Sequence, residues 1–454
     1  MMNIRTLKLT NLGRFEELDV HLAPVEEFKS NVTVFIGNNG AGKTSILKSL
    51  ATSLSWFVAR VRTEKGNGSP IPEDAILNGR SSATIELQVL NTHPATEAAT
   101  PYRWLLARTA SGKKSTTASS LQEASQLAAF YRDQYTQNSG ASFPLIAFYP
   151  VERVVLDVPL KIKERHNFLQ LDGYDNALNQ GIDFRRFFEW FRNREDAENE
   201  SGLPQDVLDK LSTRIDLDNA VLNALTAIMA SSRDRQLTAV RTAISRFMPG
   251  FSNLRVRRKP RLHMSIDKNG QTLNVLQLSQ GEKSLMALVG DIARRLAMMK
   301  PMLENPLNGE GIVLIDEVDM DMHLHPTWQR TIIQRLTTTF PHCQFVLTTH
   351  SPLVISDCKD VLVYSLDDGE LTQLPSLYGQ DANTVLLNVM DTDIRNATVA
   401  EKLNDLLDLI QKNDFINANA LLNTLSLELP ENHLELVKAR MLLRKQEIKH
   451  ARNN

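Results

Sequence analysis

The sequence predicts an α/β protein with a mixed sheet, flanking helices, a helical insert and a helical tail. Short apolar runs rich in β-branched residues, such as Val32–Ile36, Leu145–Tyr149 and Gly311–Ile315, are typical of buried strands. A glycine-rich loop follows the first of these runs and precedes a helical pattern. Helical patterns replace strand patterns over about 175–248 and again after about 383. These three observations define the fold class.

Further strands and hairpins are predicted in order along the chain. Alternating apolar and polar residues over Ile4–Leu22 predict a β-hairpin around Asn11–Arg14. An Asn-Gly pair at 269–270 predicts a second hairpin, between strand patterns at Leu254–Ile266 and Leu273–Leu276. The other strand patterns are Ala83–Leu90, Tyr102–Arg108 and Gln344–Thr349. The helical patterns of the insert are Phe184–Phe191, 207–215 and 220–247.

Composition indicates a globular chain without a membrane segment. The 454 residues are 42% hydrophobic and 23% charged, with a formal net charge of -2, so any nucleic-acid contact needs a local basic patch. Cys343 and Cys358 do not form a C-x-x-C pattern, and no run approaches the roughly 18 apolar residues of a membrane helix. Met1–Thr6 lacks the apolar core of a signal peptide. We expect a cytoplasmic location, reduced thiols and no membrane partner.

Residues Gly37–Thr44 match the pattern G-x-x-x-x-G-K-[ST] at every fixed position. The glycines let backbone N–H groups surround a phosphate, and the following helix adds the positive end of its dipole. Lys43 is expected to reach the β- and γ-phosphates, and the Thr44 hydroxyl to bind Mg²⁺. A glycine-rich turn without a ligand would not explain the flanking strand and helix. We therefore expect ATP at Asn38, Asn39, Gly40, Ala41, Gly42, Lys43, Thr44 and Ser45.

Two carboxylates, Asp316 and Glu317, follow the apolar run Gly311–Ile315. A buried parallel strand delivers the side chains at its carboxyl end to the crevice where ligands bind. We expect Asp316 to bind Mg²⁺ through water and Glu317 to polarise the attacking water as a catalytic base. Alone, the pair is equally typical of a solvated turn; the glycine-rich loop earlier in the chain favours the catalytic interpretation.

Two further motifs narrow the class. Leu278–Lys283 precedes a helical pattern, and Ser279 and Gly281 are suited to donate hydrogen bonds to a γ-phosphate, although Ser279 is equally suited to cap the helix. His350 ends a strand pattern, where it is expected to sense the γ-phosphate. A histidine at a strand end is by itself more often structural. The order of the motifs along the chain supports the functional interpretation of both.

These four motifs, in this order, resemble those of the ABC-type ATPase heads of SMC and Rad50 proteins. The resemblance implies a two-lobed head and a head-to-tail dimer that hydrolyses ATP. Within that dimer, Ser279, Gly281 and Glu282 of one chain would close on ATP held by Lys43 of the other. It also implies that Arg14 contacts a phosphate, and that Lys43, Glu317 and His350 are catalytic. No glutamine matches the residue that links the lobes in such heads; the stretch Tyr149–Arg153 occupies its place.

Other segments resemble a narrower family. Asp319–Gln329 is similar to the D-L-H-L-H-P-x-W-Q stretch of OLD-like and Septu-type ATPases, with two extra residues. Phe184–Asn199 resembles the helical insert of the same family, and Tyr378–Asn383 with Asn413–Phe415 resembles its tail. The similarity is to the ATPase subunit of Septu antiphage systems (PtuA), including those attached to retrons. It implies assembly into a homo-oligomer and a partner HNH nuclease subunit (PtuB-like).

The motifs divide the chain into four expected parts. An N-terminal lobe of the ATPase head occupies 1–150, and a mainly helical insert with a hairpin occupies 151–275. The C-terminal lobe occupies 276–375, and a helical tail occupies 376–454. Asp391 and Asp393 follow a helical pattern rather than a strand. We therefore expect no Toprim nuclease domain in the chain, and any cutting of nucleic acid would fall to a partner.

Three clusters have two interpretations each. Asp319, Asp321, His323 and His325 have the residue types of a metal site, but their spacing and Pro326 favour a structural loop. The basic run Arg255–Arg261 either contacts phosphates, with nucleic acid as a partner, or guards a solvated edge strand, which we favour. The helix His433–Lys449 either docks a partner or packs within the tail.

The sequence thus predicts the ATP-binding and ATP-hydrolysing regulatory subunit of an antiphage complex. Nucleotide-dependent dimerisation of the heads would control the bound HNH nuclease. The alternative is an SMC- or Rad50-like DNA-repair ATPase that acts directly on DNA, against which the lack of a long heptad run counts. A transporter ATPase is a third hypothesis, and the helical insert and the His-Leu-His-Pro stretch argue against it.

Overall fold

The computed structural model describes residues 1–92, 98–114, 117–151, 168–179, 184–201, 233–319, 325–430 and 432–453. Several sequence predictions fall outside these ranges: the helix at 207–215, the first part of that at 220–247, Glu152 and Arg153, and Asp321 and His323. The described chain divides into two compact units, Met1–Gln380 and Asp381–Asn454.

An antiparallel sheet forms the outer part of the first unit. Its strand order is β2-β1-β4-β5, and β1 pairs with β2 as the predicted hairpin, with Leu12 opposite Phe15. Gly13 and Arg14 form the turn between them. The strands are β1 (Met2–Leu12), β2 (Phe15–His21), β4 (Ser82–Thr92) and β5 (Ala99–Thr109).

A second, six-stranded sheet forms the centre of the unit, with the order β13-β12-β3-β11-β10-β6. All its neighbouring pairs are parallel except β12 with β13. Three strands match the predicted apolar runs, because an uninterrupted apolar run is buried on both faces. The strands are β3 (Val32–Gly37), β6 (Leu145–Tyr149), β10 (Gly311–Ile315), β11 (Cys343–Thr348), β12 (Leu362–Asp367) and β13 (Glu370–Gln373).

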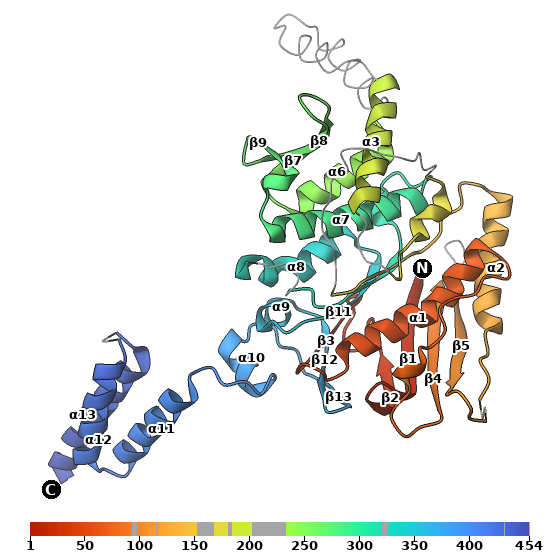
Figure 1. Ribbon diagram of the computed structural model, residues 1–454. Helices are drawn as coiled ribbons and strands as arrows, with labels where there is room; N and C mark the ends of the chain where they lie inside the picture. Colours follow the sequence, from red (N-terminus) through yellow and green to blue (C-terminus); the bar gives the residue numbers. More distant parts are fainter. Residues whose placement is uncertain are drawn as a thin grey trace, which may run out of the picture. The chain divides into compact units, whose positions relative to one another are not determined.

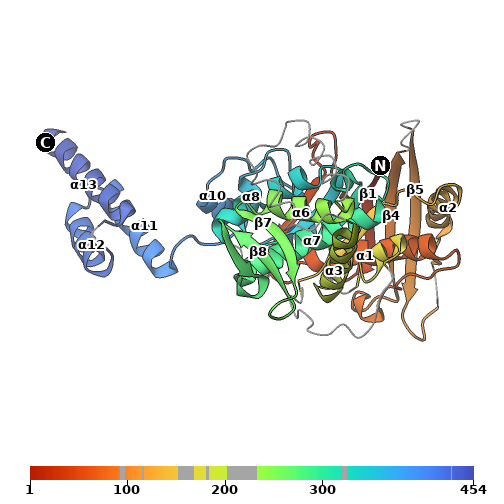
Figure 2. The ribbon, with the colours of Figure 1, turned by 90° about the horizontal axis from the view of Figure 1, so that it is seen from above.

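Helices cover these sheets (Figure 1). Helix α1 (Lys43–Arg62) packs against strands of both sheets, and α2 (Gln122–Gln137), which was not predicted from the sequence, packs on α1 and β5 (Figure 2). Helices α8 (Pro326–Thr339) and α9 (Pro352–Ser356) pack on each other. Short 3₁₀ turns are η1 (Glu73–Ala75), η2 (Gln170–Tyr174), η3 (Val275–Gln277) and η4 (Pro306–Asn308). The predicted α/β class with a mixed sheet and flanking helices is confirmed.

A helical layer with a small sheet completes the first unit. Helix α7 (Gln280–Met299) packs against α3 (Phe184–Ser201) and α6 (Arg235–Phe247). The aromatic face of α3 is at most 2% exposed at Phe184, Phe187, Phe188, Trp190 and Phe191. The small sheet has the order β7-β8-β9, with β7 (Phe251–Arg257), β8 (His263–Lys268) and β9 (Gln271–Asn274).

One strand prediction in this region was wrong. We predicted a single strand over Leu254–Ile266, but the chain leaves the sheet after Arg257 and returns at His263. The intervening segment contains Pro260, which cannot donate a ladder hydrogen bond. The predicted Asn269-Gly270 turn is present, because β8 pairs with β9 across it.

The second unit is helical, as predicted for the tail. Its helices are α10 (Ala382–Asn388), α11 (Ala397–Gln411), α12 (Phe415–Glu428) and α13 (Leu434–Asn453). Its own apolar core comprises Leu403, Leu406, Ile410, Ala418, Leu422, Leu425, Leu436, Ala439 and Leu443. Among the helices that the structure describes in either unit, none is long and apolar enough to cross a bilayer.

Candidate nucleotide-binding site

The loop between β3 and α1 has a backbone that two glycines make possible. Gly37 has φ 145°, and a Cβ atom there would meet Leu366 O at 2.3 Å. Gly42 has φ 107°, and a Cβ atom there would meet Phe15 Cζ at 2.5 Å. Positive φ and these close approaches both require glycine. The antiparallel sheet and β12 therefore shape the loop from either side.

Lys43, the first residue of α1, lies folded over this loop. Its Nζ donates hydrogen bonds to Gly37 O at 2.8 Å and to Asn38 O at 3.2 Å. The residue is only 5% exposed. Burial lowers the Lys43 pKa, and the nearby Glu317 and Asp316 oppose that shift. The ammonium group is thus fixed between the loop and the carboxylates that end β10.

The rest of the loop is open on its outer side. Asn38, Asn39 and Gly40 are exposed, while Ala41 is 3% exposed and anchors the loop. Its N–H donates to Asn38 O at 3.1 Å. Thr44 and Ser45 are half-buried in the first turn of α1. Exposed N–H groups at the start of a long helix suit an anion such as a phosphate.

Arg14 reaches the same loop from the β1–β2 turn. Its Nη1 donates to Gly40 O, and its Nη2 lies 3.8 Å from Asp368 Oδ1 in the β12–β13 turn. The side chain is 50% exposed, so the guanidinium keeps donors for an external anion. The structure thus brings Arg14 to the glycine-rich loop, where the family resemblance implied a phosphate contact.

Asp316 and Glu317 follow β10, and Thr348 at the end of β11 holds both. The Thr348 hydroxyl donates to Asp316 Oδ1 at 2.6 Å and accepts from the Glu317 N–H at 2.7 Å. Glu317 has φ 44°, a left-handed backbone that is uncommon for a non-glycine residue. Strain of this kind gathers at functional sites. Thr348 was not predicted from the sequence, because one threonine ending a strand is common.

His350 completes the group and follows Thr349, the first residue after β11. Its Nε2 lies 3.6 Å from Glu317 Oε1, and both side chains are 22% exposed. Burial and the neighbouring charge of Lys43 lower the His350 pKa. The imidazole is therefore neutral near pH 7 and has one N–H to donate. Lys43, Asp316, Glu317 and His350, predicted from separate motifs, converge at one edge of the central sheet.

Asp319 lies behind this group and has a structural partner. Its Oδ1 accepts from the Thr349 hydroxyl, and burial raises the Asp319 pKa. His325 caps α8, where its Nδ1 accepts from Thr327 N–H at 3.4 Å. The described part of the chain holds no group of three His, Cys, Asp or Glu side chains arranged for a metal ion.

The residues Ser279, Gly281 and Glu282, here called the signature corner, lie at the start of α7. Ser279 Oγ accepts from Glu282 N–H at 3.4 Å, and Glu282 Oε2 accepts from Ser279 N–H at 3.0 Å. Lys268 Nζ lies 2.7 Å from Glu282 Oε1. Burial would raise the Glu282 pKa, but the bonds from Lys268 and Ser279 outweigh it and hold the pKa low. In the described chain no hydrogen bond or ion pair links this corner to Gly37–Thr44.

A buried ionic cluster adjoins the end of β10, and it was not predicted from the sequence. Asp316 N–H donates to Tyr149 O at 2.9 Å, and Tyr149 Oη donates to Asp291 Oδ2 at 3.0 Å. Asp291 also accepts from Arg294 at 2.7 Å and from Arg295 at 2.6 Å. The three charged side chains are at most 2% exposed. In sequence, charges spaced three and four apart on a helix indicate a solvated face.

Comparison with known proteins agrees with this geometry. The family description "AAA domain" matches residues 6–218, and "AAA domain, putative AbiEii toxin, Type IV TA system" matches residues 150–356. "Retron Ec83 probable ATPase" of Escherichia coli is 32% identical over 424 residues, 84% of this chain and 77% of that protein. "Retron Vc95 probable ATPase" of Vibrio cholerae serotype O1 biovar El Tor is 31% identical over 443 residues, 91% of this chain and 84% of that protein.

A shorter match is to "Septu protein PtuA" of Bacillus mycoides (strain KBAB4), 41% identical over 115 residues, 24% of this chain and 15% of that protein. The fold and the converging motifs, with these matches, define an ABC-type P-loop ATPase related to PtuA. The chain belongs to the family of retron ATPases that the Escherichia coli and Vibrio cholerae proteins represent. The family predicted from the sequence is confirmed.

Proposed function

We propose that this ATPase is the regulatory subunit of an antiphage defence complex that controls a partner HNH nuclease (PtuB-like). Its heads would dimerise head to tail when they bind ATP. The relatives named for retrons and Septu support the setting of antiphage defence. The observation that carries the dimerisation step is that, among the described residues, no hydrogen bond or ion pair links the signature corner to Gly37–Thr44.

The two halves of the proposed site lie at the starts of two different helices, both of which contact β6. Lys43 starts α1, which packs between the two large sheets, whereas Ser279 starts α7, which packs on α3, α6 and β6. Both helix starts are suited to bind an anion. A second chain, related by a head-to-tail operation, would bring its signature corner to the γ-phosphate held by Lys43.

The residues at the end of β10 suit ATP hydrolysis. Lys43 and Arg14 would neutralise charge on the phosphates, and Glu317 would orient and deprotonate the attacking water. The neutral His350 would donate a hydrogen bond to the γ-phosphate. Thr44 and Asp316 supply the hydroxyl and carboxylate oxygens that Mg²⁺ prefers, and the ion would neutralise the phosphate charge.

The second unit is the proposed nuclease contact. Several large apolar side chains lie on its surface, among them Ile416 at 85%, Leu427 at 91% and Met441 at 69% exposure. Exposed apolar side chains that share one face mark partner surfaces, and the spacing of Ile416 and Leu427 places both on one face of α12. The helical insert is the proposed site of further contacts in a homo-oligomer.

The trans-acting serine can be tested without disturbing α7. Aspartate caps helices as well as serine does, so Ser279→Asp preserves the helix start but places a carboxylate against the γ-phosphate. We expect a Glu317→Gln chain to dimerise on ATP addition, measured by light scattering after size-exclusion chromatography. The double variant Glu317→Gln/Ser279→Asp is expected to bind ATP and to remain undimerised.

Two controls frame that experiment. Ser279→Thr, which keeps both the cap and a hydroxyl, is expected to dimerise like the Glu317→Gln parent, and Lys43→Ala is expected to lose ATP binding altogether. If the double variant with Ser279→Asp still dimerises on ATP addition, Ser279 does not contact the ATP held by the other chain. Control of the nuclease is tested separately by co-expression with an HNH subunit. If Lys43→Ala leaves the cutting of nucleic acid unchanged, this ATPase does not regulate the nuclease through ATP.

A further inference from the structure

A cluster of cations lies in the connection between β7 and β8. Residues 257–261, here called the basic loop, comprise Arg257, Arg258, Lys259, Pro260 and Arg261. All five are exposed, and Arg255 just before them is half-buried. The chain as a whole has a net charge of only -2, so this loop is a local concentration of positive charge.

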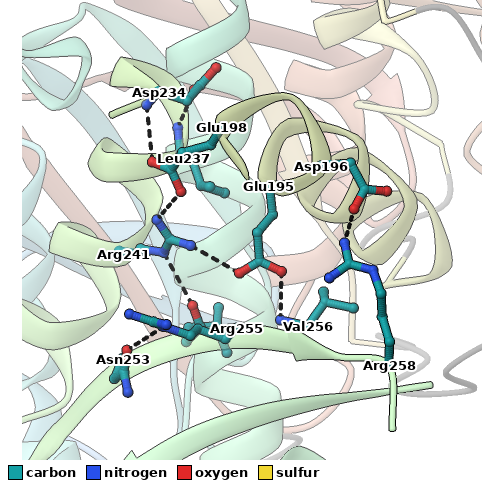
Figure 3. Close-up of polar contacts among 11 residues, drawn as sticks. Glu195, Asp196, Glu198, Asp234, Leu237, Arg241, Asn253, Arg255, Val256 and Arg258 are labelled. Carbon is teal, nitrogen blue, oxygen red and sulfur yellow. Dashed lines mark hydrogen bonds and ion pairs between the residues drawn. The ribbon is translucent and has the colours of Figure 1, made fainter. Parts of the chain in front are cut away.

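Most of this charge has no counterion among the residues that the structure describes. Arg258 pairs with Asp196 of α3 (Figure 3). No carboxylate within the described ranges forms an ion pair with Arg257, Lys259 or Arg261. Two further acids lie near these cations. Hydrogen bonds from Thr272 and Asn253 lower the Asp267 pKa, with a smaller contribution from the charge of Arg257, and Glu195 lies near Arg258. The loop therefore keeps a surplus of positive charge.

Protection of an exposed strand edge does not account for these cations. Part of the free edge of β7 is already paired, because Val256 N–H donates to Glu195 Oε2 at 2.9 Å (Figure 3) and Leu254 O accepts from Arg241 Nε at 3.1 Å. Edge strands need charged guards where such groups are left unpaired. Lys259 and Arg261 also lie beyond the end of the strand. Edge protection, the interpretation that we favoured from the sequence, therefore does not explain the cations at 259 and 261.

We propose that the basic loop binds the phosphodiester backbone of nucleic acid. Cations on a loop gain binding energy by displacing counterions from phosphates, without reading the bases. The loop is presented on a fixed frame, since Glu195 and Arg241 fasten β7 to α3 and α6, and Arg241 also pairs with Glu198 at 2.8 Å. DNA and RNA share this backbone chemistry.

The same small sheet connects the loop to the signature corner. Strand β8 follows the loop and ends at Lys268, whose Nζ pairs with Glu282 at 2.7 Å and lies 5.6 Å from the centre of the Phe251 ring. Strand β8 therefore connects a nucleic acid bound at the basic loop to the start of α7, where Ser279 lies. The proposal stands apart from control of the nuclease, because it concerns binding by this chain alone.

The test is binding of short fluorescent oligonucleotides to the purified full chain, measured by anisotropy over a salt series. The variant Arg257→Gln/Lys259→Gln/Arg261→Gln removes the three cations without carboxylate partners. The control Lys65→Gln/Lys113→Gln/Lys114→Gln removes the same charge from exposed lysines elsewhere. We expect the first variant to bind at least about tenfold more weakly than the control. Its log–log salt slope should fall by about 2 to 3.

Competition experiments distinguish which kind of nucleic acid supplies the phosphodiester backbone. Unlabelled single-stranded DNA, duplex DNA and RNA are used as competitors, and whichever competes best identifies the ligand. Closed circular duplex should compete as well as linear duplex of equal mass, since a phosphate-contacting loop needs no DNA end. Equal binding by the loop variant and the lysine control would overturn the proposal. Competition by polyglutamate as strong as that by nucleic acid would also overturn it, in favour of an acidic protein partner.

Discussion

At the scale of single residues, the arrangement of Asp316 and Glu317 depends on one threonine. The hydroxyl of Thr348 satisfies a buried carboxylate and a strained backbone N–H at once, through Asp316 Oδ1 and Glu317 N. Glu317 has φ 44°, a left-handed backbone conformation that is unfavourable for a residue with a side chain. Such strain persists only where the surroundings over-determine it. Thr348 is therefore a positioning residue for the two carboxylates.

We predict that Thr348→Val separates turnover from binding. Valine has nearly the same shape but leaves the Glu317 N–H and a lone pair of Asp316 without this partner, at a cost of about 1 to 3 kcal/mol in stability. The expected result is a fall in kcat of about tenfold or more, with the affinity for ATP nearly unchanged, because Lys43 and the loop are intact. Steady-state ATPase assays and nucleotide titration provide both numbers.

Thr348→Ser is the matched control for this prediction. Serine keeps the hydroxyl and loses one methyl group, so it should recover most of the turnover. If valine and serine reduce kcat equally, packing of the methyl group, and not the hydrogen bonds, holds the site.

At the scale of elements, the buried cluster around Asp291 joins β6, α7 and the segment after η2. Arg295 donates to Gly173 O at 2.6 Å and to Asp175 O at 3.0 Å, while Tyr149 brings in the strand next to β10. Burial alone would raise the Asp291 pKa, but Arg295 and Arg294 outweigh it and lower the pKa to about 2. The helix that carries the signature corner is thereby fixed to β6, the strand that pairs with β10.

We predict that Asp291→Asn destabilises the first unit by about 3 to 5 kcal/mol, because it leaves two arginines buried without their counterion. Tyr149→Phe removes one hydrogen bond and should cost only about 1 kcal/mol. Urea unfolding followed by tryptophan fluorescence measures both. Similar midpoints for the two variants would show that the arginines find other partners.

The same cluster predicts how stability depends on pH. The folded-state pKa of Asp291 is depressed, so its contribution is present above the ordinary aspartate value of about 4 and is lost as pH falls towards about 2. Acid titration of the wild type should show this loss between those limits. The amide introduced by Asp291→Asn cannot titrate, so that variant should show a smaller change in stability over the same interval.

At the scale of the whole molecule, the sequence predicted the elements and motifs that have a local sequence pattern. The strands at Leu145–Tyr149 and Gly311–Ile315 agree to the residue, because prolines flank the first run and carboxylates flank the second. The P-loop and the carboxylates after β10 were predicted because their backbone and charge requirements restrict the residue types. Their convergence follows from parallel strands, whose carboxyl ends share one edge.

Features that depend on tertiary context could not be predicted. Strands β12 and β13 lack a strong alternation, and α2 carries mixed polar residues whose buried face is set by contact with α1 and β5. Arg294 and Arg295 look solvated until the fold surrounds them. The break between β7 and β8 is different, because Pro260 was a sequence signal for it that the strand prediction overlooked.

The division into two units predicts that ATP binding needs only the first. Every residue assigned to the nucleotide lies within Met1–Gln380, and helices α11, α12 and α13 pack around a core of their own. A chain ending at Gln380 is therefore expected to fold and to bind ATP within about threefold of the full chain, a difference below about 1 kcal/mol. The full-length variant Leu406→Glu, which places a charge in the core of the second unit, should bind ATP equally well.

Titration with a fluorescent ATP analogue and a thermal unfolding scan test both chains. If neither chain binds ATP, the second unit supports the nucleotide site. If only the truncated chain fails to bind ATP, residues beyond Gln380 are needed for binding even when the core of the second unit is disrupted.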